Sequence, residues 1–597
     1  MTRSENIAKE KRLAWWWEAK FGLFVHWGIY AVPGGVWQGK EIEGIGEWIA
    51  YYANIPHQVY SLFANEFNPQ GFNPDDWAQL ILDAGMKYIV FTAKHCDGFS
   101  MFKSEHSDFN VVDGTPYSKD IVKQLVDACR AKGIRIGFYY SQDNDLHEPD
   151  AGAYSLLKTN VNSSLADSPE GFVRFVHRKV LPQLTELLTN YGPIDLIWFD
   201  NPVNMTEALA DEIEQHVRAI SPHTIINGRI GLGRGDYVCM GDNQVPAKRV
   251  DGYWETIGTI NDTWGYKSHD HNWKSTKALI NNLVNIVSKG GTYLLNAGPT
   301  ADGIIPEPSA DRLRDMGKWL RANGNGASIY GASPTPYDYD FDWGLITTKK
   351  TTMYLHIFEW PKTEFGIKGI KNRVKNVYFL SDPAKKVCYT KASDGGELTI
   401  ELPKKQPDQW AAVIAVELEG GKIEIDNKLQ LQPCSGLIMP GCAAVMHPAE
   451  AWGTMRLNKN GILTDWYSQD NYATWNVTID RPGEYDCYFI NKAVSLAGWL
   501  GGHKAVLSIG GQRIIKTLSA SARQRFGSTD YPFFSNRIGS VTLEAGEYTL
   551  VASASFVNPK ARGGLNIYAV KLVPAKKGRK KTANQLYDEN TEKHIFQ

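Results

Sequence analysis

The sequence predicts a (β/α)8-like TIM barrel followed by two β-sandwich domains, and three observations support this fold class. Over residues 1–335, short apolar runs typical of strands alternate with helical segments, which indicates a parallel sheet. About seven or eight such units in ~300 residues fit a closed barrel. Beyond residue 335, short alternating strands are separated by turn signals such as Asp394-Gly395-Gly396, which is typical of antiparallel sandwiches.

Most of the expected barrel strands end in polar residues. These strands span residues 22–28, 87–95, 134–141, 194–199, 224–229, 237–240, 252–256 and 291–296. Helices are expected over residues 5–20, 50–64, 77–84, 120–132, 169–191 and 275–288, and Asn73-Pro74 is typical of a helix start. Because strand C-termini meet on one face of a barrel, we expect these residues to be neighbours: His26, His95, Tyr140, Asp200, Arg229, Glu255 and Asn296.

A doubly wound open sheet is the alternative architecture for the first 335 residues. That fold usually places a Gly-rich phosphate-binding loop after its first strand. Here the first strand ends in His26-Trp27-Gly28 instead, so the barrel fits better.

Two β-rich domains are expected after the barrel. Residues 336–440 fit a small antiparallel β-sandwich, and residues 441–575 fit a jelly roll similar to carbohydrate-binding modules. In the loop 497–503 of the second domain, Trp499 is a candidate for contact with a glycan or another subunit; a packing role is the alternative. Residues 576–597 form a polar basic tail, which we expect to be a solvated segment.

Composition excludes several classes of protein. A chain of 597 residues with 43% hydrophobic and 22% charged residues is typical of globular proteins, and the net charge of −1 provides no general attraction to nucleic acid or membranes. The 7 Cys form no CxxC pair, so we expect neither a disulfide framework nor a zinc site, and no cofactor. The N-terminus has no apolar signal core, which predicts a cytoplasmic protein.

Asp200 follows the apolar run 194–199 directly and precedes Asn201-Pro202, which ends a strand. A carboxylate at the end of a buried strand needs a partner or a task, because burying a charge is costly. A loop or helix cap is one interpretation and a catalytic carboxylate is the other. With several His and Tyr donors and a second carboxylate nearby, glycoside hydrolysis is the chemistry that such a set suits. Neither a Ser nucleophile elbow nor a phosphate loop is present.

Five ordered segments also resemble a known family. They are residues 20–28 (KFGLFVHWG), 92–99 (TAKHCDGF), 197–200 (IWFD), 254–266 (from WET to WGY) and 294–299 (LLNAGP). Together they resemble family 29 glycoside hydrolases, the retaining α-L-fucosidases, over residues ~10–330. The resemblance implies an exo-acting hydrolase of terminal α-L-fucosyl residues that works by double displacement, with transfer of fucose to other acceptors as a side reaction.

The resemblance also implies site residues. Asp200 corresponds to the nucleophile of the family and Glu255 to the position most often assigned to the acid/base, with Glu47 and Glu43 as alternatives. The residues expected to bind the sugar are His26, Glu47, Trp48, His95, Cys96, Tyr140, Trp198, Arg229 and Trp264. Cys96 departs from the family, which usually has a second His there. Since a thiol is a weak donor, we expect Cys96 to form pocket wall rather than to act as a nucleophile.

Three functional hypotheses therefore follow from the sequence. The first is a retaining α-L-fucosidase whose partner is a fucosylated glycan, with copies of the chain associating through the last β domain. The second is a catalytically silent glycan-binding protein on the same scaffold. The third is a retaining hydrolase of another glycoside, such as a galactoside. Asp200 and a carboxylate partner favour an active enzyme over a silent protein.

Overall fold

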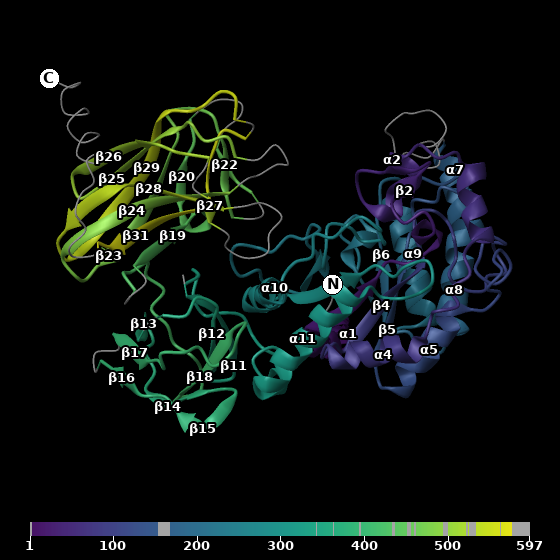
Figure 1. Cartoon of the computed structure of the whole chain (residues 1–597), viewed down its shortest axis with the longest axis horizontal. Coiled ribbons are helices and arrows are strands. Elements are labelled where there is room, and N and C mark those ends of the chain that lie inside the picture. Colours follow the sequence, from purple (N-terminus) through teal and green to yellow (C-terminus); the bar gives the residue numbers. More distant parts are fainter. Residues whose placement is uncertain are drawn as a thin grey trace.

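The computed structural model describes residues 3–152, 168–341, 343–361, 363–392, 396–432, 436–449, 455–458, 461–492, 499–520, 523–524, 533–561 and 563–575. Figure 1 shows a barrel built from the N-terminal half of the chain and, beside it, two groups of β-sheets built from the C-terminal half. Helices α10 (Thr276–Ser288) and α11 (Glu307–Ala322) lie on the side of the barrel that faces these sheets.

Eight parallel strands form the barrel, in the order β7-β6-β5-β4-β1-β10-β9-β8. Their bounds are β1 Phe21–Val25, β4 Tyr88–Lys94, β5 Arg135–Tyr140, β6 Leu196–Phe199, β7 Ile225–Ile226, β8 Val238–Cys239, β9 Trp254–Thr259 and β10 Thr292–Ala297. The two edge strands meet through a parallel bridge between Asn227 and Tyr237, next to a hydrogen bond of 2.6 Å from Asp236 N to Ile226 O. The predicted (β/α)8-like fold is confirmed.

Side chains alternate between the inside of the barrel and the layer of helices, as the pleat of a strand requires. Phe24, Tyr139 and Trp198 belong to an interior aromatic cluster, whereas their neighbours in sequence pack under the helices in the main core. Helix α1 (Arg3–Ala19) contributes Trp16 to the interior cluster, where its ring lies 4.3 Å from that of Tyr237. Helix α1 and these rings fill one end of the barrel, so the polar residues that follow the strands lie at the other end, the C-terminal face.

Most of the expected helices are present, but the one over residues 50–64 is not, and α9 (Glu207–Ile220) and α11 were not expected from the sequence. Asn73 caps α4 (Pro74–Asp83) through its side-chain oxygen, as predicted. The remaining outer helices are α5 Ile121–Ala131, α7 Pro169–Phe175, α8 Leu181–Thr189 and α9 Glu207–Ile220. The single helix expected over residues 50–64 is wrong: Ala53 to Pro56 interrupt it, giving α2 Ile49–Tyr52, α3 His57–Tyr60 and a 3-10 segment, Ser61–Asn65.

The next part of the chain forms two antiparallel sheets. One has the order β11-β12-β18-β14-β15 and the other β13-β17-β16. Their bounds are β11 Gly344–Lys349, β12 Thr352–Ile357, β13 Glu364–Lys368, β14 Val374–Phe379, β15 Asp382–Lys386, β16 Tyr389–Lys391, β17 Glu397–Glu401 and β18 Ala412–Leu418. Trp343 and Phe365 belong to the core between these sheets. Trp319 of α11 donates to Ala411 O at 2.8 Å, which links the barrel to this domain.

The last β domain consists of two five-stranded sheets and one three-stranded sheet, in the orders β19-β31-β24-β28-β27, β20-β23-β29-β25-β26 and β21-β22-β30. The strands are β19 Leu437–Pro440, β20 Val445–His447, β21 Arg456–Leu457, β22 Leu463–Trp466, β23 Tyr472–Ile479, β24 Gly483–Lys492, β25 Lys504–Ile509, β26 Gln512–Thr517, β27 Arg523–Gln524, β28 Phe533–Leu543, β29 Gly546–Phe556, β30 Leu565–Ile567 and β31 Ala569–Pro574. The predicted basic tail, residues 576–597, lies outside the described residues.

Trp499 does not present its ring to solvent, so of the two roles that the sequence left open for it the structure favours packing over contact with a glycan or a subunit. Only 6% of the residue is exposed, and its indole nitrogen donates to Ser519 O at 3.2 Å. The ring stacks on His503 and packs against Phe534 in the core of the last domain. An aromatic in a glycine-rich stretch here serves packing, the alternative that the sequence left open.

Two further observations concern the described residues as a whole. No helix among them is both long enough and apolar enough to cross a membrane. The six described cysteines, Cys96, Cys129, Cys239, Cys388, Cys442 and Cys487, are all unpaired.

A close contact between α4 and α11 yields a prediction about stability. A Cβ atom added to Gly317 would lie 1.7 Å from the carbonyl oxygen of Asp83, so Gly317→Ala must push the two helices apart. Overpacking of this kind typically costs about 1–3 kcal/mol. We expect the variant to unfold at a lower temperature in a thermal melt. The matched control is Gly421→Ala, because a Cβ there meets no atom within 4 Å. Equal melting temperatures for both variants would contradict the close packing of α4 on α11.

Candidate active site

Side chains from four strand ends meet at the C-terminal face of the barrel. His26 follows β1, His95 follows β4 and Asp200 follows β6. Arg229 is the third residue after the end of β7. The ring centroids of His26 and His95 are 5.4 Å apart. The ring of Trp264 lies 5.3 Å from His26. The structure thus brings together five residues that the sequence predicted for one site.

Asp200 is held by donors on both of its carboxylate oxygens. Arg229 Nη1 donates to Oδ1 at 2.8 Å, and the Tyr139 hydroxyl donates to Oδ2 at 3.0 Å. Asn201 Nδ2 also donates to Oδ2 at 3.0 Å. Only 12% of the Asp200 side chain is exposed. These contacts fix the carboxylate in one orientation at the base of the site.

The backbone around Asp200 is also anchored by side chains. The Asn227 amide exchanges two hydrogen bonds of 2.8 Å with the backbone N–H and C=O of Phe199. The backbone N–H of Asp200 donates to Gln142 Oε1 at 2.9 Å, and Gln142 Nε2 donates to Arg229 O at 3.1 Å. Strand end, nucleophile candidate and guanidinium therefore form one connected network.

The structure places a second carboxylate beside Asp200 that the sequence did not predict. Arg229 Nη2 donates to Asp242 Oδ1, so one guanidinium bridges Asp200 and Asp242. Half of the Asp242 side chain (50%) is exposed, in contrast to Asp200. A signal was present in the sequence, since Asp242 comes two residues after the predicted strand 237–240. It was missed because Asp242 belongs to the following loop rather than to the strand end.

The hydrogen bonds of Asn296 set the tautomer of His26. Asn296 Nδ2 donates to Trp264 O at 2.8 Å, so its Oδ1 is the acceptor that lies 2.7 Å from His26 Nδ1. His26 Nδ1 therefore carries the proton, and Nε2 of the neutral ring is an acceptor. Burial lowers the pKa of His26 to about 4, so the ring is neutral over the ordinary pH range. A substrate hydroxyl can donate to Nε2.

His95 and Cys96 lie together rather than on opposite sides of a strand. Strand β4 ends at Lys94, and the Cys96 Sγ atom lies 3.2 Å from His95 Nδ1. Burial holds the pKa of the His95 ring well below, and that of the Cys96 thiol well above, their ordinary values. Both groups are therefore neutral, which agrees with Cys96 as pocket wall and argues against a thiolate nucleophile.

Tyr140, predicted to bind the sugar, points away from the site. Its hydroxyl donates to Gln183 Oε1 on α8 at 2.8 Å, and it packs in the layer between strands and helices. The neighbouring Tyr139 takes its place: it stacks on His95 at 5.1 Å and on Trp198 at 5.5 Å. The expectation was wrong by one residue, which in a strand selects the opposite face.

Glu255 is not at a strand end, which corrects the expected position. Strand β9 begins at Trp254, so Glu255 is its second residue and lies inside the barrel, fully buried. Three donors surround its carboxyl group: Trp198 Nε1 at 2.9 Å, and the hydroxyls of Tyr88 and Tyr237 at 3.3 Å each. Burial raises the pKa of Glu255 to about 7. Tyr88 is the first residue of β4, so Glu255 lies toward the end of the barrel that α1 covers.

The remaining predicted residues lie on the loops above the strand ends. Glu47 is buried, and its Oε2 accepts from Gly265 N at 2.8 Å, which ties the segment Gly46–Trp48 to the loop that carries Trp264. Burial raises the pKa of Glu47 to about 7. The ring of Trp48 contacts Tyr51, and Glu43 is exposed. Within the described ranges, no group of three or more His, Cys, Asp or Glu side chains is arranged to hold a metal ion.

Comparisons with known proteins point to one family. A family model described as Alpha-L-fucosidase matches residues 2–325. The tissue alpha-L-fucosidase of Bos taurus is 34% identical over 384 residues, which cover 60% of this chain and 76% of the bovine protein. The crystal structure of an alpha-L-fucosidase from Vibrio sp. strain EJY3 covers 95% of this chain and 98% of its own, with a TM-score of 0.81 and 27% identity.

A second solved structure bears on chemistry. It is a GH29 alpha-L-fucosidase from Bacteroides thetaiotaomicron, described as a trapped covalent intermediate in complex with 2-fluoro-fucosyl fluoride. It covers 69% of this chain and 96% of its own, with a TM-score of 0.62 and 28% identity.

The buried carboxyl group of Glu255 yields a prediction about stability and pH. Its pKa is about 7 in the folded chain, against an ordinary value of 4.5 for a glutamate in water, so between these values the folded state binds the additional proton. Stability from this group is therefore fully present below pH 4.5 and falls as pH rises to 7. We expect Glu255→Gln to melt near the wild-type temperature at about pH 5 and above it at about pH 8.

Thermal melts of both proteins at several pH values check this expectation. The matched control is Glu41→Gln at an exposed position, which should show no such divergence. A Glu255→Gln variant whose melting temperature falls further below wild type at about pH 8 than at about pH 5 would contradict it.

Proposed function

Because the chain belongs to the α-L-fucosidase family of glycoside hydrolases, we propose that it is a retaining exo-α-L-fucosidase. It removes terminal α-L-fucosyl residues from glycans by double displacement, with Asp200 as the nucleophile. The observation that carries the proposal is a pair of carboxylates bound by one guanidinium: Arg229 Nη1 contacts Asp200 and Arg229 Nη2 contacts Asp242. The covalent intermediate named for the Bacteroides relative supports a retaining mechanism.

Asp200 suits the role of nucleophile for three reasons. It lies at the base of the site, it is mostly buried, and Arg229 and Tyr139 orient both of its oxygens. As Asp200 attacks the anomeric carbon its negative charge is lost, and the Tyr139 hydroxyl is then free to interact with a sugar oxygen. Orientation by fixed donors places the reacting atoms without further ordering, which is a large part of catalysis.

We propose Asp242 as the acid/base in place of Glu255. It protonates the leaving oxygen in the first step and takes a proton from water in the second. Its half-exposed side chain lies where a leaving glycan and an incoming water both have access. Glu255 is enclosed in the barrel interior and has no such access. Glu47 is the second candidate, because burial raises its pKa to about 7, but its carboxylate is engaged by Gly265 N.

The other site residues bind and orient the sugar in this proposal. His26 Nε2 accepts a hydrogen bond from a sugar hydroxyl, and His95 contributes a second neutral ring. Trp264 provides an apolar face, which suits the methyl group and ring carbons of fucose. The same glycosyl-enzyme can pass fucose to a sugar hydroxyl instead of water, which we propose as a side reaction.

The first test of the proposal uses a panel of nitrophenyl glycosides. We expect turnover of the α-L-fucoside and little of the galactosides, with the α anomer of fucose as the first product by NMR. Asp200→Asn should lower kcat at least about 10³-fold, because the nucleophile is lost. A β product, or near wild-type turnover by Asp200→Asn, would refute the retaining mechanism with this nucleophile. A wild-type protein that binds fucosides without turnover would favour the silent glycan-binding protein.

Rescue by azide identifies the acid/base. With an activated aryl fucoside, the Ala variant of the true acid/base still forms the glycosyl-enzyme but cannot activate water. Azide needs no base, so we expect it to restore turnover in Asp242→Ala with α-L-fucosyl azide as the product, because azide replaces water in the second inversion. Glu255→Ala serves as the comparison and should show no rescue. Rescue in Glu255→Ala or Glu47→Ala, but not in Asp242→Ala, would move the role to that residue.

Tyr139 and Tyr140 form a matched pair of adjacent tyrosines with different surroundings. Tyr139→Phe removes a hydrogen bond to the Asp200 carboxylate, and hydrogen bonds to charged groups contribute about 1.5–3 kcal/mol. We expect kcat/KM to fall about 10- to 100-fold. Tyr140→Phe removes a bond to Gln183 outside the barrel and should change kcat/KM less than about threefold. The reverse order of effects would show that Tyr140 faces the substrate.

A further inference from the structure

A cavity of 440 Å³ lies where the barrel and both β domains meet. Its walls come from α10, from the segment before β11, from Phe358 after β12, and from strands β24, β28 and β31. The loop residues Val245, Pro246 and Ala247 of the barrel complete it. Its volume falls within the range of small-molecule sites, about 300–1,000 Å³. None of the residues assigned above to the site of Asp200 lines it.

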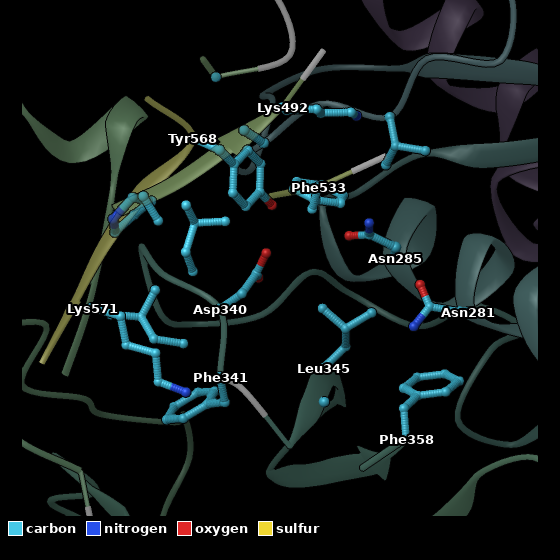
Figure 2. Close-up of a pocket in the computed structure, with 18 of the residues that line it drawn as sticks. Asn281, Asn285, Asp340, Phe341, Leu345, Phe358, Lys492, Phe533, Tyr568 and Lys571 are labelled. Atoms are coloured by element: carbon cyan, nitrogen blue, oxygen red, sulfur yellow. The ribbon is translucent and has the colours of Figure 1, made fainter. Parts of the chain in front are cut away.

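The walls combine flat aromatic faces with polar groups. Phe341, Phe358, Phe533 and Tyr568 supply aromatic rings, and Figure 2 shows them around one space. In the same view, the Tyr568 hydroxyl and the Asp340 carboxylate point into this space, and the Asn285 amide faces it from α10. Aromatic planes suit the apolar faces of sugar rings, and amides both donate and accept hydrogen bonds.

One acceptor in this wall lacks a partner. Asn285 Oδ1 is buried and makes no hydrogen bond within the part of the chain that the structure describes. A buried acceptor without a hydrogen bond destabilises the folded state. Because Asn285 lines the cavity, a rotation of its side chain would bring this enclosed acceptor to a ligand hydroxyl there.

The charges of the lining favour a neutral ligand. Lys492 and Lys571 are matched in number by Asp340 and Glu359. These charges also have partners of their own: Asp340 pairs with Lys289, Glu359 pairs with Lys277, and Lys492 Nζ lies 5.0 Å from the centroid of the Phe533 ring. A ligand with a net charge would face both signs, whereas a neutral polyhydroxylated ligand can use donors and acceptors alike.

We propose that this cavity binds a neutral saccharide, separately from the fucoside that is cleaved at Asp200. Such a ligand is a sugar unit of one or two residues without fucose, held between the aromatic rings and the Asn285 amide. The binding site goes beyond the proposed hydrolysis and does not depend on it.

The position of the cavity links it to the loop of Asp242. This loop is pinned to β9, because Asn243 N donates to Ile257 O at 2.9 Å and Thr256 Oγ1 donates to Gln244 O at 2.7 Å. Further along this loop, Ala247 packs closely on Gly461 of the last domain, because a Cβ atom added to Gly461 would lie 2.0 Å from the Ala247 Cβ. All three domains are thus needed to form the cavity, and its test requires the full chain.

Saturation-transfer NMR with lactose and with N-acetyllactosamine tests the proposal. Excess L-fucose occupies the fucosyl position at Asp200, so a remaining saturable signal that the cavity variants remove reports the second site. We expect at least one disaccharide to bind the wild type, and Asn285→Leu to weaken that binding at least tenfold. Gln215→Leu is the matched control, since it replaces an exposed amide on α9, and it should bind as the wild type does.

A second variant keeps the test decisive if Asn285→Leu does not fold. Asn281→Trp fills the cavity from the half-buried face of α10 and should also abolish binding. Both variants should retain wild-type turnover of nitrophenyl fucoside, which shows an intact barrel. The proposal is overturned if neither disaccharide binds in the presence of L-fucose, or if binding survives in a folded cavity variant. Since no turnover is measured in the binding assay, its failure leaves the hydrolase assignment untouched.

Discussion

The ion pairs of Arg229 with Asp200 and Asp242 are the interaction on which the site depends. Two carboxylates close together repel each other, and burial penalises each charge. One guanidinium between them reduces both penalties and fixes their separation. Burial alone would lower the pKa of Arg229, but the two carboxylates raise it above its ordinary value, so the cation persists. The Cζ atom of Arg229 lies 4.9 Å from the centroid of the Trp198 ring. This cation–π contact helps to fix the orientation of the guanidinium.

The barrel provides the frame for this bridge. Helix α1 closes one end with Trp16, and a layer of aromatic rings fills the interior up to Trp198 and Tyr139. Polar groups that the chain buries there, such as Glu255, are surrounded by donors from the barrel wall. The charged residues that follow the strands, such as Asp200 and Arg229, therefore lie at the C-terminal face of the barrel. The neutral state of His26 follows from the same burial, and it supplies an acceptor without adding a charge.

Strand-end logic predicted His26, His95, Asp200 and Arg229 from the sequence, because an apolar run followed by a polar residue marks both the strand and its end. It selected Tyr140 instead of Tyr139, since both are aromatic and a β-bulge near Lys94 shifts the register of β4 against β5. It misplaced Glu255 because the start of β9 has no clear sequence mark. Asp242 was missed because it lies in a loop. The path of the loop backbone brings it to the site, and local sequence patterns do not predict that path. Trp499 shows the same limit: composition suggested a contact surface, and tertiary packing buried it.

Both β domains are in contact with the barrel. The last domain packs on the loop that follows Asp242 through Gly461 and Ala247, and the first is joined to α11 through Trp319. The similarity of the Vibrio structure extends over 95% of the chain, so this arrangement of domains is shared with a known alpha-L-fucosidase. Contacts of this kind explain how residues far from the barrel can set the position of a loop at the site.

Chemical trapping tests most directly whether Asp200 forms the covalent bond to fucose. Incubation with 2-deoxy-2-fluoro-fucosyl fluoride should slow release of the glycosyl-enzyme, because fluorine at C2 disfavours the positive charge that develops in the transition state. Digestion and peptide mass spectrometry should then show one fluorofucosyl group, on Asp200. A label on Asp242, Glu47 or Glu255, or turnover of the reagent without any label, would contradict the assignment of Asp200 as the nucleophile.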